Sequence, residues 1–255
     1  MNITIYTVTH KKVDLTLPAC YQKIAVGKIT DDELDNTYVK DNVGINISGK
    51  NPNYCELTAQ YWIWQNDRSD VVGLCHYRRF LTSHRFSNDV KYILNDAEIF
   101  RELAHGTDII LPYRPFARRT VKEIYCDYGT EKDWNILKDC LAELEPEYLQ
   151  EFTALEQRHS NYSKNILICR KNLFDQYSEW LFRILFEVEN RVDLTAYDAQ
   201  YVRIFGYMSE RLLEVWVRTN HLRIRHYRLL NTEEKTGLQE RLIEALGIAL
   251  NRFKY

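Results

Sequence analysis

The stretch VVGLCHYRRF, residues 71–80, decides the fold, because an apolar run meets a polar cluster at a defined point. Val71–Cys75 has the composition of a buried strand. The four residues that follow are His76, Tyr77, Arg78 and Arg79. Solvated arginines at a strand end are the ordinary interpretation of this pattern. The functional interpretation is an anion site, since guanidinium groups match phosphate oxygens two at a time.

The segments before this stretch complete a strand, helix and strand unit. Ile3–His10 is a β-branched and aromatic run that predicts a first strand, and it ends in a polar Thr9, His10, Lys11 loop. Residues 30–53 are rich in turn formers and predict a long surface excursion. A helix follows, with Asn51 or Asn53 as its cap. A βαβ unit predicts parallel strands whose carboxyl ends share one edge of the sheet.

The segments after it predict a single α/β domain with a helical C-terminal part. Strands are expected over Thr107–Pro112, Asn165–Arg170 and 221–230, and helices over about 133–157, 173–191, 208–219 and 235–255. The strand at 107–112 empties into a second basic loop that contains Arg118. We expect a Rossmann-type, mostly parallel sheet flanked by helices. Residues 231–255 form an amphipathic tail that either packs on the core, mediates a homodimer or contacts a membrane surface.

Composition and charge exclude several classes of protein. The chain has 255 residues, 45% of them hydrophobic and 27% charged, which is typical of a globular protein. The net charge of −2 gives no reason to expect nucleic acid as a partner. Six cysteines, spaced singly, predict reduced thiols rather than disulfides or zinc ligands. The short polar opening and the absence of a long apolar run predict a cytoplasmic protein.

Converging cationic strand ends favour a diphosphate ligand, but the familiar phosphate motifs are missing. The chain contains neither G-x-x-x-x-G-K-[ST], nor G-x-G-x-x-G after a strand, nor D-x-D. The negative charge of a bound diphosphate must then be balanced by Arg, Lys and His side chains, or by a divalent metal that is held in another way. His76 is a single weak candidate for a ligand of such a metal. Lys50 and Asn51 precede a helix, and two roles are equally compatible with this position: binding of an anion at the helix N-terminus, or capping of the helix by Asn51.

A late helix supplies the candidate general base. Gly206 is expected to precede this helix, with Ser209 and Glu210 in its first turn. The structural interpretation of Glu210 is a carboxylate that the helix dipole stabilises near the helix start. The functional interpretation is a general base in a partly desolvated cleft. Asp198, in the loop upstream, is the competing candidate.

Five segments resemble a bacterial family of capsular and exopolysaccharide biosynthesis proteins, long catalogued as a domain of unknown function and regarded as glycosyltransferases. The segments are YTVTHK, NISGKNPNYCELTAQYWIWQN, VVGLCHYRRF, DIILP and FGYMSERLLEVW, and the resemblance spans about residues 3–228. It implies a GT-A-like domain over residues 1–230. It also implies a nucleotide-sugar donor and a lipid-linked glycan acceptor in capsule, exopolysaccharide or O-antigen synthesis. His76, Tyr77 and Arg78 stand where such enzymes carry D-x-D, which puts their usual Mn or Mg ion in doubt.

The residue patterns and the resemblance together give candidates for individual roles. Catalytic candidates are Glu210, Asp198 and His76. Donor-binding candidates are Thr9, His10, Lys11, Lys50, Asn51, Tyr54, His76, Tyr77, Arg78 and Arg79. Acceptor-binding candidates are Asn165 and Arg118. The expected reaction is hexosyl transfer with inversion at the anomeric carbon, and retention is the alternative outcome.

Two other functions are open at this point. The missing D-x-D favours a non-catalytic module that binds a sugar nucleotide or a glycan. The same arginines would also suit a phosphotransferase. For the enzyme, we expect a cytoplasmic location, with peripheral contact at the inner face of the plasma membrane as the alternative use of the C-terminal tail.

Overall fold

The computed structural model describes residues 1–28, 34, 36–197 and 202–233. Within these ranges the strands are β1 (Ile3–Thr9), β2 (Tyr21–Ala25), β3 (Val39–Lys40), β4 (Val71–His76), β5 (Arg79–Thr82), β6 (Ile109–Pro112), β7 (Leu167–Arg170) and β8 (Ile224–Asn231). The α-helices are α1 (Asn51–Tyr54), α2 (Leu57–Asn66), α3 (Asp96–Ala104), α4 (Val121–Tyr125), α5 (Glu131–Leu144), α6 (Leu149–Glu156), α7 (Lys171–Arg191) and α8 (Ile204–Thr219). Four 3-10 helices are η2 (Ser48–Lys50), η3 (Val90–Tyr92), η4 (Pro146–Tyr148) and η5 (Leu194–Ala196).

The parallel part of the sheet is built on β4. β4 lies beside β1 in parallel register, with Ile5 opposite Gly73 and Val8 opposite His76. β2 continues the sheet beside β1, and β3 beside β2, again in parallel. The predicted βαβ unit of β1, the intervening helices and β4 is therefore confirmed, and the carboxyl ends of β1, β2 and β4 share one edge.

The other half of the sheet is antiparallel in most of its pairings and closes on itself. β4 pairs antiparallel with both β5 and β7. β5 pairs antiparallel with β8, and β6 pairs parallel with β8 and antiparallel with β7. The strands β4, β5, β8, β6 and β7 therefore form a closed ring. The expectation of a mostly parallel sheet is wrong, since four of the eight pairings are antiparallel. The cause lies at Tyr77 and Arg78, where the chain turns back and pairs Arg79 with His76.

The core lies on both faces of β4, as strand periodicity requires. Val72 and Leu74 belong to the larger apolar cluster, which the helices cover, whereas Val71 and Cys75 belong to a second cluster on the other face. Alternate side chains of a strand point to opposite faces, so both faces of this strand are buried. That burial explains why Val71–Cys75 reads as an unbroken apolar run.

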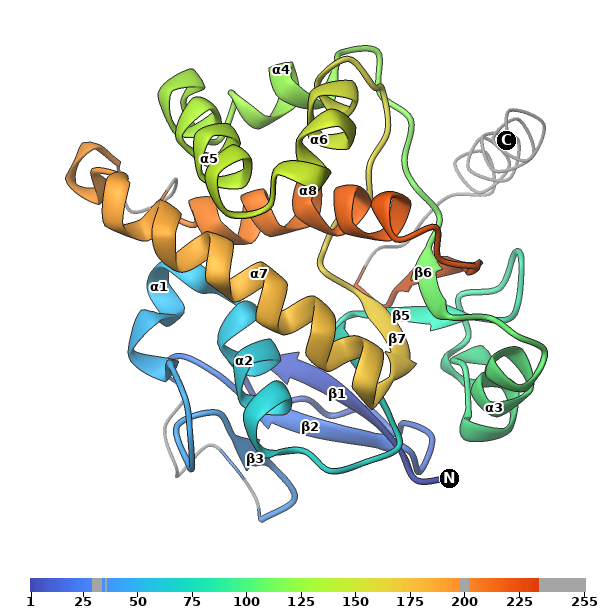
Figure 1. The fold of residues 1–255 in the computed structure, drawn as a ribbon. Coiled ribbons are helices and arrows are strands. Elements are labelled where there is room, and N and C mark those ends of the chain that lie inside the picture. The colour runs from blue at the N-terminus through green and yellow to red at the C-terminus, as the bar shows by residue number, and fades with distance from the viewer. Residues whose placement is uncertain (29–33, 35, 198–201, 234–255) are drawn as a thin grey trace.

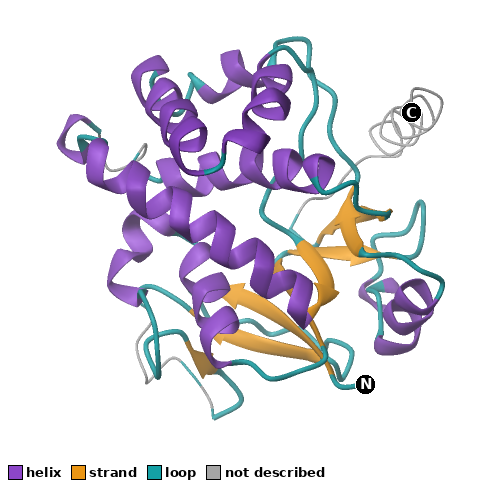
Figure 2. Ribbon diagram, in the orientation of Figure 1, coloured by secondary structure: helices purple, strands orange, loops and turns teal. Residues whose placement is uncertain are grey.

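Helices cover one face of the sheet in two layers (Figures 1 and 2). α7 packs against β4, β7, α2 and α8, and α8 also contacts α1. α5 and α6 form the outer layer, on α7 and α8 respectively. α3 lies apart from them, beside β5 and β6 (Figure 1).

Several boundaries differ from the prediction for identifiable reasons. The helix expected over residues 54–66 is broken at Cys55, whose φ of 51° is outside the helical range. The stretch 133–157 splits into α5 and α6 around Pro146, which starts a 3-10 turn. α8 begins at Ile204, so Gly206 lies inside it and Glu210 falls in its second turn. β2 was missed, because Gln22 and Lys23 interrupt its apolar pattern.

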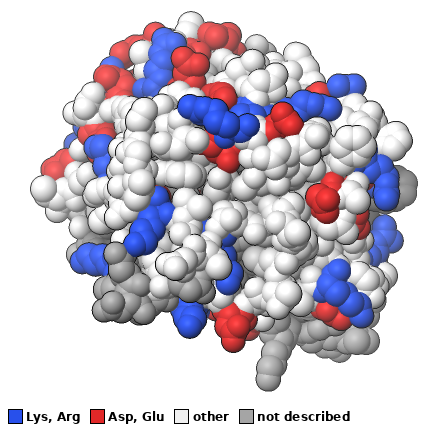
Figure 3. All heavy atoms as spheres, turned by 90° about the horizontal axis from the view of Figure 1, so that it is seen from below, with Lys and Arg blue, Asp and Glu red and all other residues white. Residues whose placement is uncertain are grey.

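The surface and the C-terminal tail complete the description. On the face drawn in Figure 3, acidic and basic side chains are interspersed among uncharged ones. None of the helices in the described ranges combines the length and the apolar composition needed to cross a bilayer. Residues 234–255, where the amphipathic tail was expected, lie outside the described residues, so that helix stays a prediction.

Candidate active site

A pocket of about 470 Å³ opens at the shared edge of β1, β2 and β4. Its walls come from the ends of these strands, the junction of α1 and α2, the loop before β7 and the first half of α8. The lining residues are Val8, Thr9, His10, Val26, Gly27, Lys28, Asn51, Pro52, Cys55, Glu56, His76, Tyr77, Arg78, Arg79, Lys164, Arg203, Gly206, Tyr207 and Glu210. The volume lies in the range of small-molecule sites, and the place is where open α/β sheets bind ligands.

The lining is predominantly positive. A cationic cluster consists of Lys28, Arg78, Arg79, Lys164 and Arg203. Against these five side chains stand two carboxylates, those of Glu56 and Glu210. A concave site with this excess of positive charge favours an anionic ligand, because the pocket walls limit solvent screening.

The β4–β5 turn presents the two arginines of the opening stretch. Arg78 lies in the turn and Arg79 opens β5, so both follow the same reversal of the chain. Arg78 Nη1 donates to Glu233 Oε2 at 2.8 Å, and Lys11 Nζ donates to Glu233 Oε1 at 2.9 Å. Tyr77 lies beneath Lys11, whose Nζ is 4.6 Å from the ring centroid. A carboxylate therefore already lies between two cations at the end of β1 and β4.

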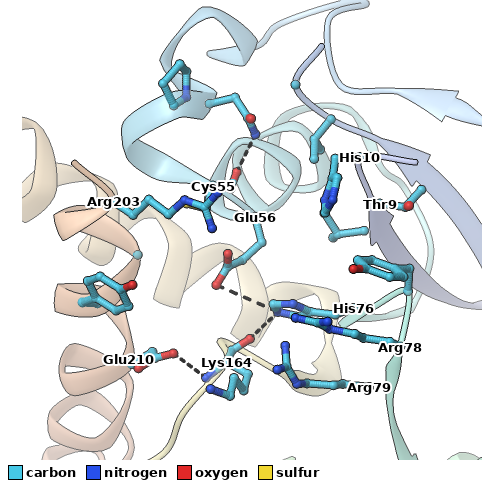
Figure 4. A pocket seen from close by; sticks show the side chains of 18 of the residues that line it. Thr9, His10, Cys55, Glu56, His76, Arg78, Arg79, Lys164, Arg203 and Glu210 are labelled. Carbon is cyan, nitrogen blue, oxygen red and sulfur yellow. Dashed lines mark hydrogen bonds and ion pairs between the residues drawn. The ribbon is translucent and has the colours of Figure 1, made fainter. Parts of the chain in front are cut away.

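The backbone of Lys164 connects two side chains from opposite walls of the pocket (Figure 4). Its N–H donates to Glu210 Oε1 at 2.7 Å, and its carbonyl oxygen accepts from His76 Nε2 at 2.6 Å. Lys164 and Asn165 have φ values of 74° and 52°, so two consecutive non-glycine residues are left-handed. Such conformations are strained and cluster at functional sites. The turn that they form aims the two backbone groups in these directions.

His76 is held as one tautomer by this contact. A carbonyl oxygen can only accept, so Nε2 must carry the proton, and in the neutral ring Nδ1 keeps its lone pair. Burial lowers the pKa of His76, while Glu56, whose Oε1 is 3.9 Å from Nε2, acts in the opposite direction. Burial therefore favours the neutral ring.

Glu56 occupies the break between α1 and α2. Its Oε1 accepts from Asn165 Nδ2 at 2.8 Å, and the same amide donates to the Gly206 carbonyl at 3.2 Å. Asn165 therefore ties the start of α2 to α8 and orients Glu56 toward His76. Neighbouring Cys55 also lines the pocket, but burial raises the pKa of its thiol to about 12, which keeps it protonated.

Glu210 is the second carboxylate and lies mostly buried, with 13% of its side chain exposed. Its Oε2 accepts from Arg211 Nη1 at 2.9 Å, in addition to the Lys164 bond. Burial raises the pKa of Glu210, and the Arg211 charge opposes that rise. A carboxylate with a raised pKa is a better proton acceptor near neutral pH than an exposed one.

Asn51 lines the pocket, but the prediction that Asn51 or Asn53 caps the helix is wrong. The N-cap positions of α1 and α2 are Lys50 and Glu56, and no side-chain capping bond is formed at either. Asn51 Nδ2 donates to the Cys55 carbonyl at 2.9 Å and to Thr58 Oγ1 at 3.1 Å. The loop after β2 fits closely against it. Gly27 has a φ of +75°, and a Cβ there would lie 2.7 Å from Asn51 Oδ1, so only glycine fits at this approach.

The structure brings most of the predicted site residues together. Those that line the pocket are Thr9, His10, Asn51, His76, Tyr77, Arg78, Arg79 and Glu210. Lys11, Lys50, Tyr54, Asn165 and Arg118 are outside its lining. Lys50 and Tyr54 both contact Glu189, at 2.7 Å and 3.0 Å, and Arg118 is exposed in the loop after β6. Asp198 lies outside the described residues.

The second basic loop does not join the pocket, contrary to the expected convergence of cationic strand ends. Arg114 donates to buried Glu214 on α8 at 2.7 Å, and Arg119 pairs with Asp127. β6 lies in the closed ring, beside β7 and β8 and away from β1. The pocket lining includes no residue of the loop after β6, so the arginines of this loop do not reach the site.

Sequence patterns missed several lining residues. Among them are Lys28, Glu56, Lys164, Arg203 and Tyr207. Lys28 follows the unpredicted β2, and Glu56 was concealed inside a segment read as continuous helix. Over the described part of the chain, no three His, Cys, Asp or Glu side chains gather in a way that could hold a metal ion. The described lining, with Glu56, His76 and Glu210 on separate walls, therefore does not fit a divalent metal ion held by the protein alone.

Comparison with known proteins places the chain in a family. The profile of the family described as a domain of unknown function (DUF4422) matches residues 4–221, and the chain belongs to this family. Among solved structures, it is similar to the apo structure of WbbM, a bifunctional glycosyltransferase. The two are 30% identical with a TM-score of 0.81, over 92% of this chain and 46% of WbbM. The chain thus spans about half the length of that protein. No curated protein matches.

Proposed function

We propose that this protein transfers a sugar from a nucleotide-sugar donor to a hydroxyl group of a glycan acceptor. One observation carries the proposal: a single pocket unites the cationic cluster with Glu210, a mostly buried carboxylate of raised pKa. The cluster suits the leaving diphosphate and the carboxylate suits the attacking hydroxyl. The similarity to a glycosyltransferase over 92% of the chain supports the same reaction class.

In this proposal the donor diphosphate lies against the turn between β4 and β5. Arg78 and Arg79 contact it there, and Arg203 approaches from the start of α8. Lys28, in the turn after β2, also lines this pocket. Guanidinium groups bind phosphate oxygens two at a time and stabilise the charge that develops as the diphosphate departs. These cations would take the electrostatic role of the metal ion that the D-x-D acids hold in GT-A-like enzymes.

The chemical step is a direct displacement with inversion. The Glu210 carboxylate accepts the proton of the acceptor hydroxyl while the hydroxyl oxygen forms a bond to the anomeric carbon of the donor sugar. The bond from that carbon to the diphosphate breaks, and the nucleoside diphosphate leaves with the electron pair. His76 and Lys164 hold Glu210 in place through the Lys164 backbone.

The proposal also covers the partners that the sequence suggested. The transferred group is a hexosyl residue, and the acceptor is a lipid-linked glycan in the synthesis of capsule, exopolysaccharide or O-antigen. Such an acceptor would place the protein at the cytoplasmic face of the membrane. Lys11, Lys50, Tyr54 and Arg118 are left out of the proposed contacts, because they lie outside the pocket lining.

Purified protein incubated with a panel of nucleotide sugars tests the proposal. We expect slow release of nucleoside diphosphate from the correct donor, since water can replace the acceptor. Glu210→Gln should abolish the release, and Glu98→Gln, at an α3 capping position, should preserve it. Saturable donor binding without any release would instead favour the non-catalytic module. Mass analysis showing phosphate transfer would favour the phosphotransferase.

A further inference from the structure

A pair of tyrosines lies at the mouth of the pocket on the α8 side. Tyr207 lines the pocket and follows Arg203 by one helical turn. The ring centroid of Tyr128 is 4.8 Å away, with 30° between the ring planes. Tyr128 is 42% exposed, so part of its ring is open to solvent. The tyrosine pair, Tyr128 and Tyr207, thus extends an aromatic surface outward from the pocket.

The position of Tyr128 is fixed by its neighbours. The Tyr128 and Gly129 N–H groups both donate to the carbonyl of Tyr125, which is fully buried in the core. Gly129 approaches the Tyr125 ring so closely that a Cβ at this position would lie 2.6 Å from it. Thr130 then caps α5. A short turn anchored at both ends therefore presents Tyr128, and little conformational entropy remains to be lost on binding.

The pair is also next to the proposed base. Tyr207 and Glu210 are three residues apart on α8, which places them on one face of the helix. Figure 4 shows Arg203 and Glu210 reaching into the pocket from α8, with His76, Arg78 and Arg79 on the facing wall. Among the described residues, neither phenol group has a hydrogen-bond partner, so both hydroxyls are available to a ligand.

We propose that the tyrosine pair is the acceptor subsite, on which the terminal sugar of the acceptor glycan stacks with its C–H face toward the rings. This inference rests on the proposed function. Stacking there would direct a hydroxyl of that sugar toward Glu210, while the donor diphosphate lies against the turn between β4 and β5. The phenol groups would accept or donate hydrogen bonds to the remaining sugar hydroxyls. Specificity for a glycan over water follows, because water gains nothing from the aromatic surface.

Binding of synthetic glycosides tests the subsite. A panel of octyl hexopyranosides and octyl hexofuranosides is titrated against the full chain by saturation-transfer NMR, with a nucleoside diphosphate present. We expect Tyr128→Ala to weaken binding of the best glycoside roughly fivefold to tenfold, because one stacking surface is lost. Tyr128→Phe should stay within about twofold, and so should Phe116→Ala, which removes another exposed ring that is not part of the lining.

Nucleoside diphosphate affinity, measured by calorimetry on the same variants, distinguishes failure of the acceptor subsite from failure of the proposed function. Unchanged nucleotide affinity together with weakened glycoside binding in Tyr128→Ala supports the subsite. Equal glycoside affinity in Tyr128→Ala and the parent overturns the subsite, and so does a nucleotide-binding parent that binds no glycoside of the panel. Failure of the parent to bind any nucleoside diphosphate or to hydrolyse any donor would overturn the proposed function itself.

Discussion

His76 Nε2 donates to the carbonyl oxygen of Lys164 at 2.6 Å, although the two residues are 88 positions apart in the chain. The N–H of Lys164 donates to Glu210, so one residue's backbone links the strand wall of the pocket to the helix wall. Because Lys164 is left-handed and is followed by left-handed Asn165, the loop has little freedom to keep both bonds in another conformation. The spacing between the donor side and the base side is set by this loop.

The two arginines of the β4–β5 turn should determine affinity for the donor diphosphate. Arg78→Ala and Arg79→Ala are each expected to weaken nucleoside diphosphate binding about tenfold to a hundredfold, since each removes charge-assisted hydrogen bonds. Isothermal titration calorimetry measures the change. Arg85→Ala is the matched control, because Arg85 is exposed and outside the lining. Parental affinity in both pocket variants would refute the placement of the diphosphate.

Glu233 should compete with the donor for Arg78. Its carboxylate accepts from both Lys11 and Arg78, in the position of an anion at the strand ends. Glu233→Gln removes the charge, so we expect nucleoside diphosphate to bind up to about fivefold more tightly in calorimetry. The gain should shrink in 0.5 M salt, because exposed ion pairs are screened. Weaker binding in this variant would show that Glu233 supports the site instead.

Glu210→Gln should keep the fold and lose the reaction. The amide oxygen can still accept from the Lys164 N–H, but the side chain can no longer accept a proton. We expect the rate of transfer to fall about 10²-fold to 10⁴-fold with nucleotide affinity unchanged. Steady-state kinetics and calorimetry on the same preparation check both halves. Full activity would transfer the role of base to Asp198.

The pH dependence of the parent provides a separate test of Glu210. Burial raises its pKa above the ordinary value of 4.5, and only the ionised form accepts a proton. The acid limb of kcat/KM should therefore lie above pH 4.5, with activity rising as pH rises through the raised pKa. The free energy of unfolding should change in the opposite direction. Because the folded state holds this proton more tightly than the unfolded state, the contribution of Glu210 to stability is lost as pH rises. An acid limb at or below pH 4.5 would exclude Glu210 as the titrating base.

His226 should make the fold sensitive to acid. Burial, with Arg114 and Arg225 nearby, lowers its pKa from 6.5 to about 4, and its Nε2 lies 2.8 Å from the Tyr162 hydroxyl. The folded state binds fewer protons than the unfolded state in this window, so stability falls as pH drops through it. We expect a loss of roughly 3 kcal/mol between pH 6.5 and 4, measured by urea unfolding. His226→Gln, which keeps an acceptor for Tyr162, should flatten this dependence; an equally steep curve would contradict the assignment.

Local sequence was informative wherever an element's own residues decide its state. The β-branched run of β1, the apolar run of β4 and the amphipathic period of α7 each identified the element. The polar cluster after Cys75 and the late helix carboxylate both proved to line the pocket. In each case the signal lies within about twenty residues of chain, over which periodicity reports which face is buried.

The buried strand at Val71–Cys75 and the polar residues that end it can be predicted from the amino-acid sequence, because hydrophobic periodicity is a local property. The return of β5 to close a ring, and the meeting of Glu56, Lys164 and Arg203 with His76 in one pocket, depend on the folded chain. Those residues come from four separate segments, and periodicity specifies which face of an element is buried but not which element covers it. The site therefore depends on strand pairing and on the left-handed turn at Lys164, neither of which has a local sequence signal.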